Sequence, residues 1–463
     1  MKILIRGAGD LATGIASRLY GAGHKIIMTD IAVPLTVRRT VALSRAVYDG
    51  KAVVENLEGF RVENQEKAEA VLAEGGIPVL VDPEASCREW YQPDVIVDAI
   101  LAKRNLGTKI SDAPFVIGVG PGFSAGEDCN CVVETKRGHT LGKIIWQGAA
   151  IPNTGVPGNV GGFTIERLLK ATADGEIQPL AQIGDYVELG QTVAITGGEP
   201  VKAKMTGVIR GMLQDNVPVQ TGLKIGDIDA RAERSHCFTI SDKARAIGGG
   251  VLEAVTCYER QKGKYALVLL AAGKSSRFEG NKLQEEIRGK KMYEIALERL
   301  QAFSGFRSYV VTGSEEIAEK AEALGIQAVC NKEPEKGIAL SLHLGLGRAM
   351  QQNPELDGVM FSVCDQPELS IATMQKILNT ASWHRGSIVC AGKGEKTGNP
   401  VLWSKKYFEE LLTLTGDKGG SRLMSKYAEN VRIIQTEQEE LRDVDYREDL
   451  KDISYCLQLC CEQ

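Results

Sequence analysis

The sequence predicts an α/β protein: a Rossmann-like N-terminal domain with an inserted small β barrel-sandwich module, followed by a second Rossmann-like domain. Three observations support this prediction. The chain opens with a buried strand, a glycine turn and a helix; its middle changes to short alternating strands between glycine turns; and a second buried strand near residue 265 runs into another glycine turn. At 463 residues the chain is long enough for several domains.

The domain boundaries follow from these changes of texture. We expect the first Rossmann-like domain at 1–174, the β module at 175–235, and a helix at 236–260 that returns to the first domain. Residues 261–264, Gln-Lys-Gly-Lys, read as a linker, and the second α/β domain is expected at 265–463.

Composition excludes several classes of function. The formal charge of −5 and the pI near 5.8 provide no positive field for nucleic acid or an anionic membrane, so neither is an expected partner. No run of about 18 apolar residues occurs, and the start lacks a signal-peptide pattern, so a cytoplasmic location is expected. Eleven cysteines without a Cys-x-x-Cys pair fit reduced thiols better than a disulfide framework.

The first strand and turn carry a possible nucleotide-binding fingerprint. Gly7-x-Gly9-x-x-Ala12 permits a tight turn and a close approach to a pyrophosphate at a helix N-terminus, and Asp30 is placed to accept a hydrogen bond from a ribose hydroxyl. The sequence therefore predicts that Gly7, Gly9, Asp10, Ala12 and Asp30 bind NAD(P) or another nucleotide. In the alternative interpretation, the glycines serve helix-to-strand packing and Asp10 caps the helix.

The middle of the chain predicts a small antiparallel sandwich. The segments IGDYVELGQTVA and PVKAKMTGVI resemble the barrel-sandwich hybrid of biotinyl and lipoyl domains. Those domains carry a lysine at an exposed hairpin tip, whereas Lys202 and Lys204 lie in a strand-like stretch. A structural module is therefore favoured over a cofactor-carrying arm.

A second phosphate-type loop begins near Leu267. The apolar strand runs into Gly-Lys-Ser-Ser-Arg, a pattern unlike the Walker loop. Its backbone N–H groups can wrap a triphosphate, while Arg277 and Lys282 neutralise the charge of the departing pyrophosphate. The nucleotide-binding candidates in this loop are Leu270, Ala271, Ala272, Gly273 and Ser275.

Further segments fit the same site. Gly337 and Ser341 stand at the start of a helical pattern, where they can face phosphate. Asp365 ends a buried strand and is the first expected Mg²⁺ ligand; Asp445, or alternatively Asp443, is the second, because Mg²⁺ sites use one or two carboxylates.

These segments together resemble the molybdenum-cofactor cytidylyltransferase family, whose fold is of the GT-A-like nucleotidyltransferase type. The resemblance rests on Ala271–Lys282, Glu333–Leu342, the CDQP run, GNPVLW, GDKGG and the closing Asp-Val-Asp. It implies transfer of CMP from CTP to molybdopterin with Mg²⁺, catalysed by Arg277, Lys282 and Asp365. It also places Ala272 and Gln366 in the cytidylyl branch and makes Gln366 a further nucleotide-binding candidate. Glu279 before Gly280 departs from the family pattern. A guanylyl or sugar-nucleotide transferase is the alternative.

The N-terminal part resembles an accessory protein of selenium-dependent molybdenum hydroxylases. The motifs RGAGDLATG, VDAILAKRNLGT and KIGDIDAR carry this similarity, which implies a role in hydroxylase maturation and a molybdenum hydroxylase apoenzyme as partner. Cys129 and Cys131 suggest selenium or metal handling, although ordinary packing is favoured for two cysteines in a strand. A dinucleotide-dependent oxidoreductase or a selenium carrier is the alternative for this half.

Overall fold

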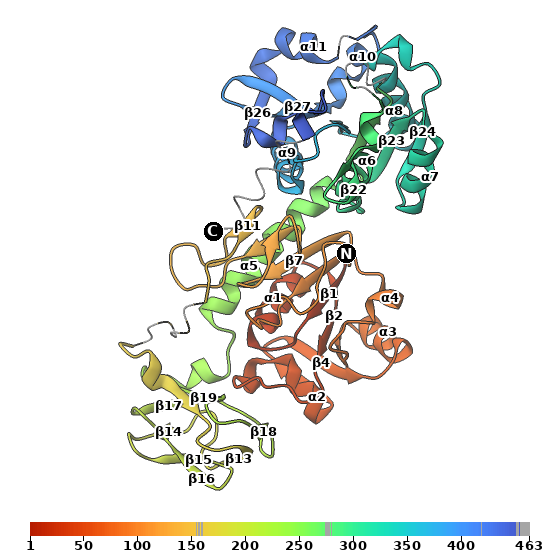
Figure 1. Ribbon diagram of the computed structural model, residues 1–463. Helices are drawn as coiled ribbons and strands as arrows, with labels where there is room; N and C mark the ends of the chain where they lie inside the picture. The colour runs from red at the N-terminus through yellow and green to blue at the C-terminus, as the bar shows by residue number, and fades with distance from the viewer. Residues whose placement is uncertain are drawn as a thin grey trace. The chain divides into compact units, whose positions relative to one another are not determined.

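The computed structural model describes residues 1–153, 155, 158, 161–273, 278, 280–417, 419–450 and 453. It divides the chain into two compact units, Met1–Val255 and Thr256–Gln463 (Figure 1). Each unit is built on a mostly parallel sheet, so the predicted α/β class is confirmed. No helix in the described part of the chain is both long and apolar enough to cross a membrane.

The first unit contains a nine-stranded sheet in the order β10-β9-β7-β6-β1-β2-β5-β4-β3. The pairs from β4 to β9 are parallel, and the outer pairs β3–β4 and β9–β10 are antiparallel. The chain order reverses between β1 and β6, which makes their carboxyl ends the topological switch point of a doubly wound sheet. The strands are β1 (Lys2–Arg6), β2 (Lys25–Asp30), β3 (Lys51–Val54), β4 (Leu57–Val62), β5 (Ile77–Val81), β6 (Val95–Asp98), β7 (Phe115–Val119), β9 (Cys131–Val133) and β10 (Ile144–Ile145).

Helices α1 (Asp10–Gly21) and α5 (Asp242–Gln261) approach each other closely in this unit. A Cβ atom on Gly14 of α1 would lie 2.5 Å from the Cβ of Ala244, so only glycine allows α5 to pack there. Helix α5 begins six residues after the start of the predicted segment 236–260, and it includes Gln261, the first residue of the predicted linker. The remaining helices of the unit are α2 (Ala46–Asp49), α3 (Gln65–Ala73) and α4 (Arg88–Tyr91).

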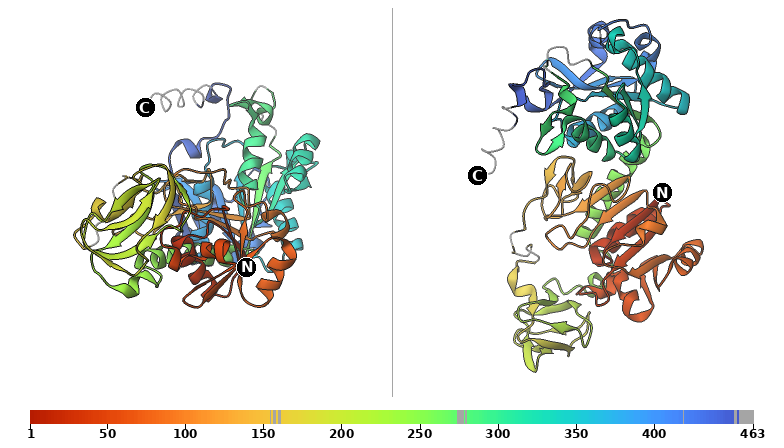
Figure 2. Two further views of the ribbon diagram at one scale, coloured as in Figure 1. Left: turned by 90° about the horizontal axis from the view of Figure 1, so that it is seen from below. Right: turned by 45° about the vertical axis from the view of Figure 1, so that its right-hand side comes forward.

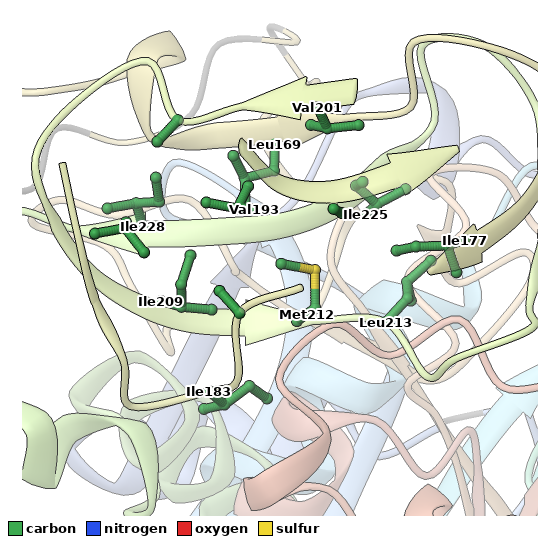
Figure 3. Close-up of a cluster of buried hydrophobic side chains, with 14 of the residues drawn as sticks. Leu169, Ile177, Ile183, Val193, Val201, Ile209, Met212, Leu213, Ile225 and Ile228 are labelled. Carbon is green, nitrogen blue, oxygen red and sulfur yellow. The ribbon is translucent and has the colours of Figure 1, made fainter. Parts of the chain in front are cut away.

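The β module consists of two four-stranded sheets that enclose one apolar core (Figures 2 and 3). One sheet has the order β12-β19-β17-β14 and the other β16-β15-β13-β18, with antiparallel pairing throughout. Strand β12 belongs to this module, seven residues before the predicted start at 175, because Leu169 is buried in its core. The strands are β12 (Leu168–Lys170), β13 (Gly175–Pro179), β14 (Tyr186–Val187), β15 (Thr192–Thr196), β16 (Glu199–Lys202), β17 (Gly207–Met212), β18 (Pro218–Val219) and β19 (Lys224–Asp229).

The core of the β module gives a direct test of its packing. Ile209 is fully buried among its apolar side chains (Figure 3), so Ile209→Ala should destabilise the module by about 2–5 kcal/mol. Leu189, which is 68% exposed, is the matched control, and Leu189→Ala should change stability by less than about 0.5 kcal/mol. Equal shifts of the two variants in chemical denaturation would contradict this packing.

The second unit contains a seven-stranded sheet in the order β24-β23-β20-β25-β27-β26-β28. Its first four strands are parallel, β27 runs antiparallel to both neighbours, and β28 is parallel to β26. A parallel core with one reversed strand places the ends of β20 and β25 next to each other at one edge. The strands are β20 (Tyr265–Ala271), β23 (Arg307–Thr312), β24 (Gln327–Cys330), β25 (Gly358–Val363), β26 (Ile388–Lys393), β27 (Lys396–Ser404) and β28 (Val431–Gln435).

Helix α8 (Ile338–Gln352) joins β24 to β25 and packs against β20 and β23 (Figure 1). Its apolar residues Leu342 and Leu346 share a core with Val268 and Val311 of these strands. The start of α8 thereby lies at the edge where β20 and β25 end. The other helices of the unit are α6 (Met292–Gln301), α7 (Glu315–Ala323), α9 (Ile371–Trp383), α10 (Phe408–Leu411) and α11 (Ser421–Lys426).

Candidate active site

A cavity of about 590 Å³ opens at the carboxyl ends of β20 and β25 and reaches the start of α8. Parallel pairing sets Leu270 beside Val363, and the N–H of Cys364 donates to the carbonyl oxygen of Leu270 (3.2 Å), so the residues after the two strands lie together. The described lining residues are Leu270, Ala271, Ala272, Gly273, Phe278, Lys282, Leu283, Pro334, Glu335, Gly337, Ile338, Ser341, Val363, Cys364, Asp365, Asp417 and Asp445.

Lys282 is the one cationic side chain among the described residues that line this cavity. Its Nζ donates to Asp365 Oδ2 (2.5 Å), to Asp445 Oδ1 (3.4 Å) and to the carbonyl oxygen of Val444 (3.1 Å). Burial opposes the charged ammonium, but the carboxylates of Asp365 and Asp445 outweigh it and raise the pKa of Lys282. The side chain of Asn281 caps the short turn that starts at Lys282 by accepting a hydrogen bond from the N–H of Leu283. This bond holds the backbone that carries Lys282.

Asp443 is exposed to solvent and is not among the described residues that line the cavity. Partial desolvation of its carboxyl by neighbouring protein atoms, together with repulsion from Asp365 and Asp445, raises its pKa to about 6. Of the two aspartates considered as second metal ligand, the structure brings Asp445 to the cavity beside Asp365.

Gln366 is buried and does not line the cavity, in contrast to its predicted role as a nucleotide-binding residue. The residue is 2% exposed, and its Nε2 donates to Asp443 Oδ1 (2.9 Å) and to the carbonyl oxygen of Leu441 (3.3 Å). Both partners are acceptors, so the orientation of the amide is determined. In this structure the side chain of Gln366 therefore contacts protein, and it does not line the cavity.

The start of α8 is joined to a distant loop. Gly337 adopts φ +84° and ψ 179°, a conformation open to glycine, and a Cβ there would lie 2.4 Å from the carbonyl carbon of Gly416. The N–H of Ala339 donates to the carbonyl oxygen of Gly416 (3.1 Å). Ser341, in the first turn of α8, accepts a hydrogen bond from Asn331 (2.9 Å). The contact at Gly337 brings Asp417 to the cavity.

Most of the residues that the sequence predicted for the site of this unit line the cavity. Two carboxylates of the cavity were not predicted. Ser275 and Arg277 lie outside the described residues. The missed carboxylates are Glu335 and Asp417; the GDKGG motif contained Asp417, but its spacing gave no reason to place it near Gly337. The candidates that line the cavity are Leu270, Ala271, Ala272, Gly273, Lys282, Gly337, Ser341, Asp365 and Asp445.

The N-terminal candidates lie at the carboxyl ends of β1 and β2, where the carboxylate of Asp30 bonds to the glycine loop. Asp30 accepts from the N–H of Ala8 (3.0 Å), which is one of the donors that a pyrophosphate would require. Asp10 caps no helix N–H but accepts from Arg38 (3.2 Å). Gly7 has φ +96°, and a Cβ there would lie 2.9 Å from the carbonyl oxygen of Ala99.

Gly9 precedes α1 with φ −67°, and Ala12 is buried within that helix. Because Gly7 lies against the carbonyl group of Ala99, the loops after β1 and β6 pack directly on each other at the switch point. Nucleotide binding by this unit stays a prediction.

Cys129 and Cys131 are both fully buried. Burial raises the pKa of the Cys129 thiol to about 12, so this thiol is protonated at neutral pH. Among the described residues, no group of three or more His, Cys, Asp or Glu side chains is arranged to hold a metal ion. The burial of both side chains is what a packing role requires.

The acidic cavity lies at the carboxyl ends of parallel strands, where ligands bind in sheets of this type. Residues 267–431 match the family model described as the MobA-like NTP transferase domain. The match covers the cavity residues from Leu270 to Asp417 and ends before Asp445.

Similar proteins cover parts of the chain. The uncharacterized protein YqeB of Escherichia coli (strain K12) is 48% identical over 253 residues, which are 55% of this chain and 47% of YqeB; the chain thus spans about half the length of that relative. The crystal structure of Rv0371c from Mycobacterium tuberculosis H37Rv is 26% identical and covers 41% of this chain and 97% of its own, with a TM-score of 0.35.

Two further solved structures are similar to this chain. A nucleotidyl transferase from Methanothermobacter thermautotrophicus (Mth528) is 20% identical over 42% of this chain and 99% of its own, with a TM-score of 0.36. Molybdopterin-guanine dinucleotide biosynthesis protein A from Archaeoglobus fulgidus is 15% identical over 43% of this chain and all of its own, with a TM-score of 0.32.

Proposed function

We propose that the second unit transfers CMP from CTP to molybdopterin and releases pyrophosphate. The observation that carries this proposal is the convergence of Lys282, Asp365 and Asp445 at the end of the phosphate-type loop. Five of the six segments that resemble the cytidylyltransferases contribute described residues to this cavity, all except GNPVLW. Reaction of two anions requires charge neutralisation and alignment rather than a side-chain base, because a terminal phosphate is already ionised.

The residues of the cavity divide between the two tasks. Lys282 binds the β- and γ-phosphates after exchanging its carboxylate partners for phosphate oxygens, with Arg277 as the second cation. The N–H groups of the loop that follows β20, and those at the start of α8, hold the phosphate chain. Ala272 borders the base. These contacts orient the α-phosphorus toward the incoming phosphate oxygen and stabilise the charge on the leaving group.

The donor set fits a divalent cation such as Mg²⁺. Asp365 and Asp445 already converge on one cation, the ammonium of Lys282, and hard carboxylate oxygens are the ligands that Mg²⁺ prefers. Bound between them, Mg²⁺ would neutralise charge on the nucleotide phosphates.

Binding of nucleotide should therefore depend strongly on the divalent cation. Among the described lining residues, one lysine stands against four carboxylates, a net formal charge of −3 that repels a triphosphate. Replacing Mg²⁺ by EDTA should weaken CTP binding at least tenfold, or about 1.4 kcal/mol, in calorimetry. The Asp365→Asn/Asp445→Asn variant should lose most of this dependence. Equal CTP affinity of the unaltered protein with and without Mg²⁺ would contradict the proposed site.

The first unit is proposed to serve the maturation of selenium-dependent molybdenum hydroxylases, with a hydroxylase apoenzyme as partner. The resemblance of its motifs to the accessory protein supports this role.

The test of the transferase activity of the second unit is product analysis: with CTP, Mg²⁺ and molybdopterin, mass spectrometry should detect the cytidine dinucleotide of the pterin. A guanosine dinucleotide formed from GTP instead would assign the site to the guanylyl alternative.

A further inference from the structure

We propose that Gln366 is a positioning residue that sets the separation of Asp365 and Asp445, and that Arg299 holds it in place. This inference rests on the proposed function, because it concerns the two carboxylates that would bind the divalent cation. It differs from the direct nucleotide binding that the resemblance implies for Gln366.

The two carboxylates come from segments far apart in the chain. Asp365 follows β25, whereas Asp445 lies in the segment 441–445, which belongs to no strand. The sheet therefore positions Asp365 but not Asp445. Some other set of contacts has to fix the distance between them.

Hydrogen bonds between described residues join the segment at Asp365 to the segment 441–445. The N–H of Val444 donates to the carbonyl oxygen of Asp365 (2.9 Å). The Nε2 of Gln366 donates to the carbonyl oxygen of Leu441 (3.3 Å) and to Asp443 Oδ1 (2.9 Å). One buried amide thus bonds to the segment at two positions, and both bonds come from the residue next to Asp365.

Arg299 holds the backbone at Gln366 and Pro367, the turn that follows Asp365. This residue of α6 is buried, and its guanidinium donates to the carbonyl oxygens of Gln366 (3.1 Å) and Pro367 (2.9 Å). Burial lowers the pKa of Arg299 to about 10, so the group is still charged at neutral pH. A charged donor to two successive carbonyl groups holds the backbone on which Gln366 stands.

Partners behind a metal site orient its ligands, and their loss typically weakens metal binding by about 10–100-fold. Gln366→Met keeps the length of the side chain but removes the N–H donors to Leu441 and Asp443. We therefore expect Gln366→Met to weaken binding of the cation at Asp365 and Asp445 by at least tenfold, without changing which nucleobase is preferred.

The test measures Mn²⁺ binding by electron paramagnetic resonance in the absence of nucleotide. The unaltered protein should bind Mn²⁺ in a manner abolished by Asp365→Ala, and Gln366→Met should raise the Kd at least tenfold. Asp443→Asn keeps an oxygen acceptor for Gln366 and should remain within about threefold of the unaltered protein. Arg299→Lys keeps the charge, but its shorter side chain does not reach both carbonyl groups as Nη2 of Arg299 does, so it should shift the Kd in the same direction as Gln366→Met.

The outcomes separate this inference from the proposed function. Mn²⁺ binding that depends on Asp365 but is unchanged in both Gln366→Met and Arg299→Lys would overturn the positioning role alone. Absence of Asp365-dependent binding in the unaltered protein would overturn the metal pair, and the positioning role with it. A changed ratio of CTP to GTP affinity in Gln366→Met at unchanged Mn²⁺ affinity would show that Gln366 reads the base.

Discussion

Replacement of Asp365 by alanine is expected to lower the rate of nucleotidyl transfer by roughly 10²–10³-fold, the loss that follows removal of one preorganised electrostatic group from a reaction centre. Asp365 bonds Lys282 at 2.5 Å and lines the cavity at the end of β25. Its removal would leave Lys282 with Asp445 as its one carboxylate partner within ion-pair distance among the described residues. Steady-state rates with saturating CTP and Mg²⁺ measure the effect.

Asp357 supplies the matched control. It precedes β25, so it lies at the amino end of the strand whose carboxyl end leads to Asp365. Asp357→Ala should therefore retain nearly full activity. An Asp365→Ala protein that folds normally by circular dichroism and keeps its activity would show that this carboxylate plays no part in the reaction.

Gly337→Ala is expected to disturb both stability and activity of the second unit. The backbone conformation at Gly337 is one that residues with a Cβ rarely adopt, which costs about 1–3 kcal/mol. The new Cβ would also overlap the carbonyl group of Gly416 and displace the loop that carries Asp417. For a unit of this size, the backbone strain alone should lower the Tm by roughly 2–12 °C.

Gly347 in the same helix is the control for this substitution. It is exposed in the interior of α8, and a Cβ there would meet no atom within 4 Å. Gly347→Ala should leave stability unchanged or raise it by about 0.5–1 kcal/mol. If both alanine variants unfold at the same temperature as the unaltered protein, Gly337 does not constrain the loop at Gly416.

The sequence predicted those site residues whose position follows from the strand or helix next to them. Asp365 follows a buried apolar strand, and the glycine turn follows another, so parallel pairing of β20 and β25 was enough to bring them together. Gly337 and Ser341 were found in the same way, since the start of a helix after a parallel strand lies at that edge of the sheet.

Contacts between distant segments were not predictable in this way. Asp417 reaches the cavity because Gly416 packs on Gly337, and nothing in either local pattern indicates that contact. Gln366 was expected at the nucleotide, but its amide is turned toward Asp443 and Leu441, which follow it by more than 70 residues.

The same limit applies to the first unit. The fingerprint around Gly7 correctly indicated strand, turn and helix, but not that Asp30 would bond to the N–H of Ala8. Side-chain partners of this kind depend on tertiary packing, to which strand and helix periodicity is insensitive.

Cytidylyl transfer by the second unit is tested by its release of pyrophosphate. Purified protein with Mg²⁺ and molybdopterin should release pyrophosphate with CTP and much less with GTP, ATP or UTP, and release should require the pterin. Release that favours another nucleotide, or no pterin-dependent release with any of the four, would contradict transfer of CMP to the pterin.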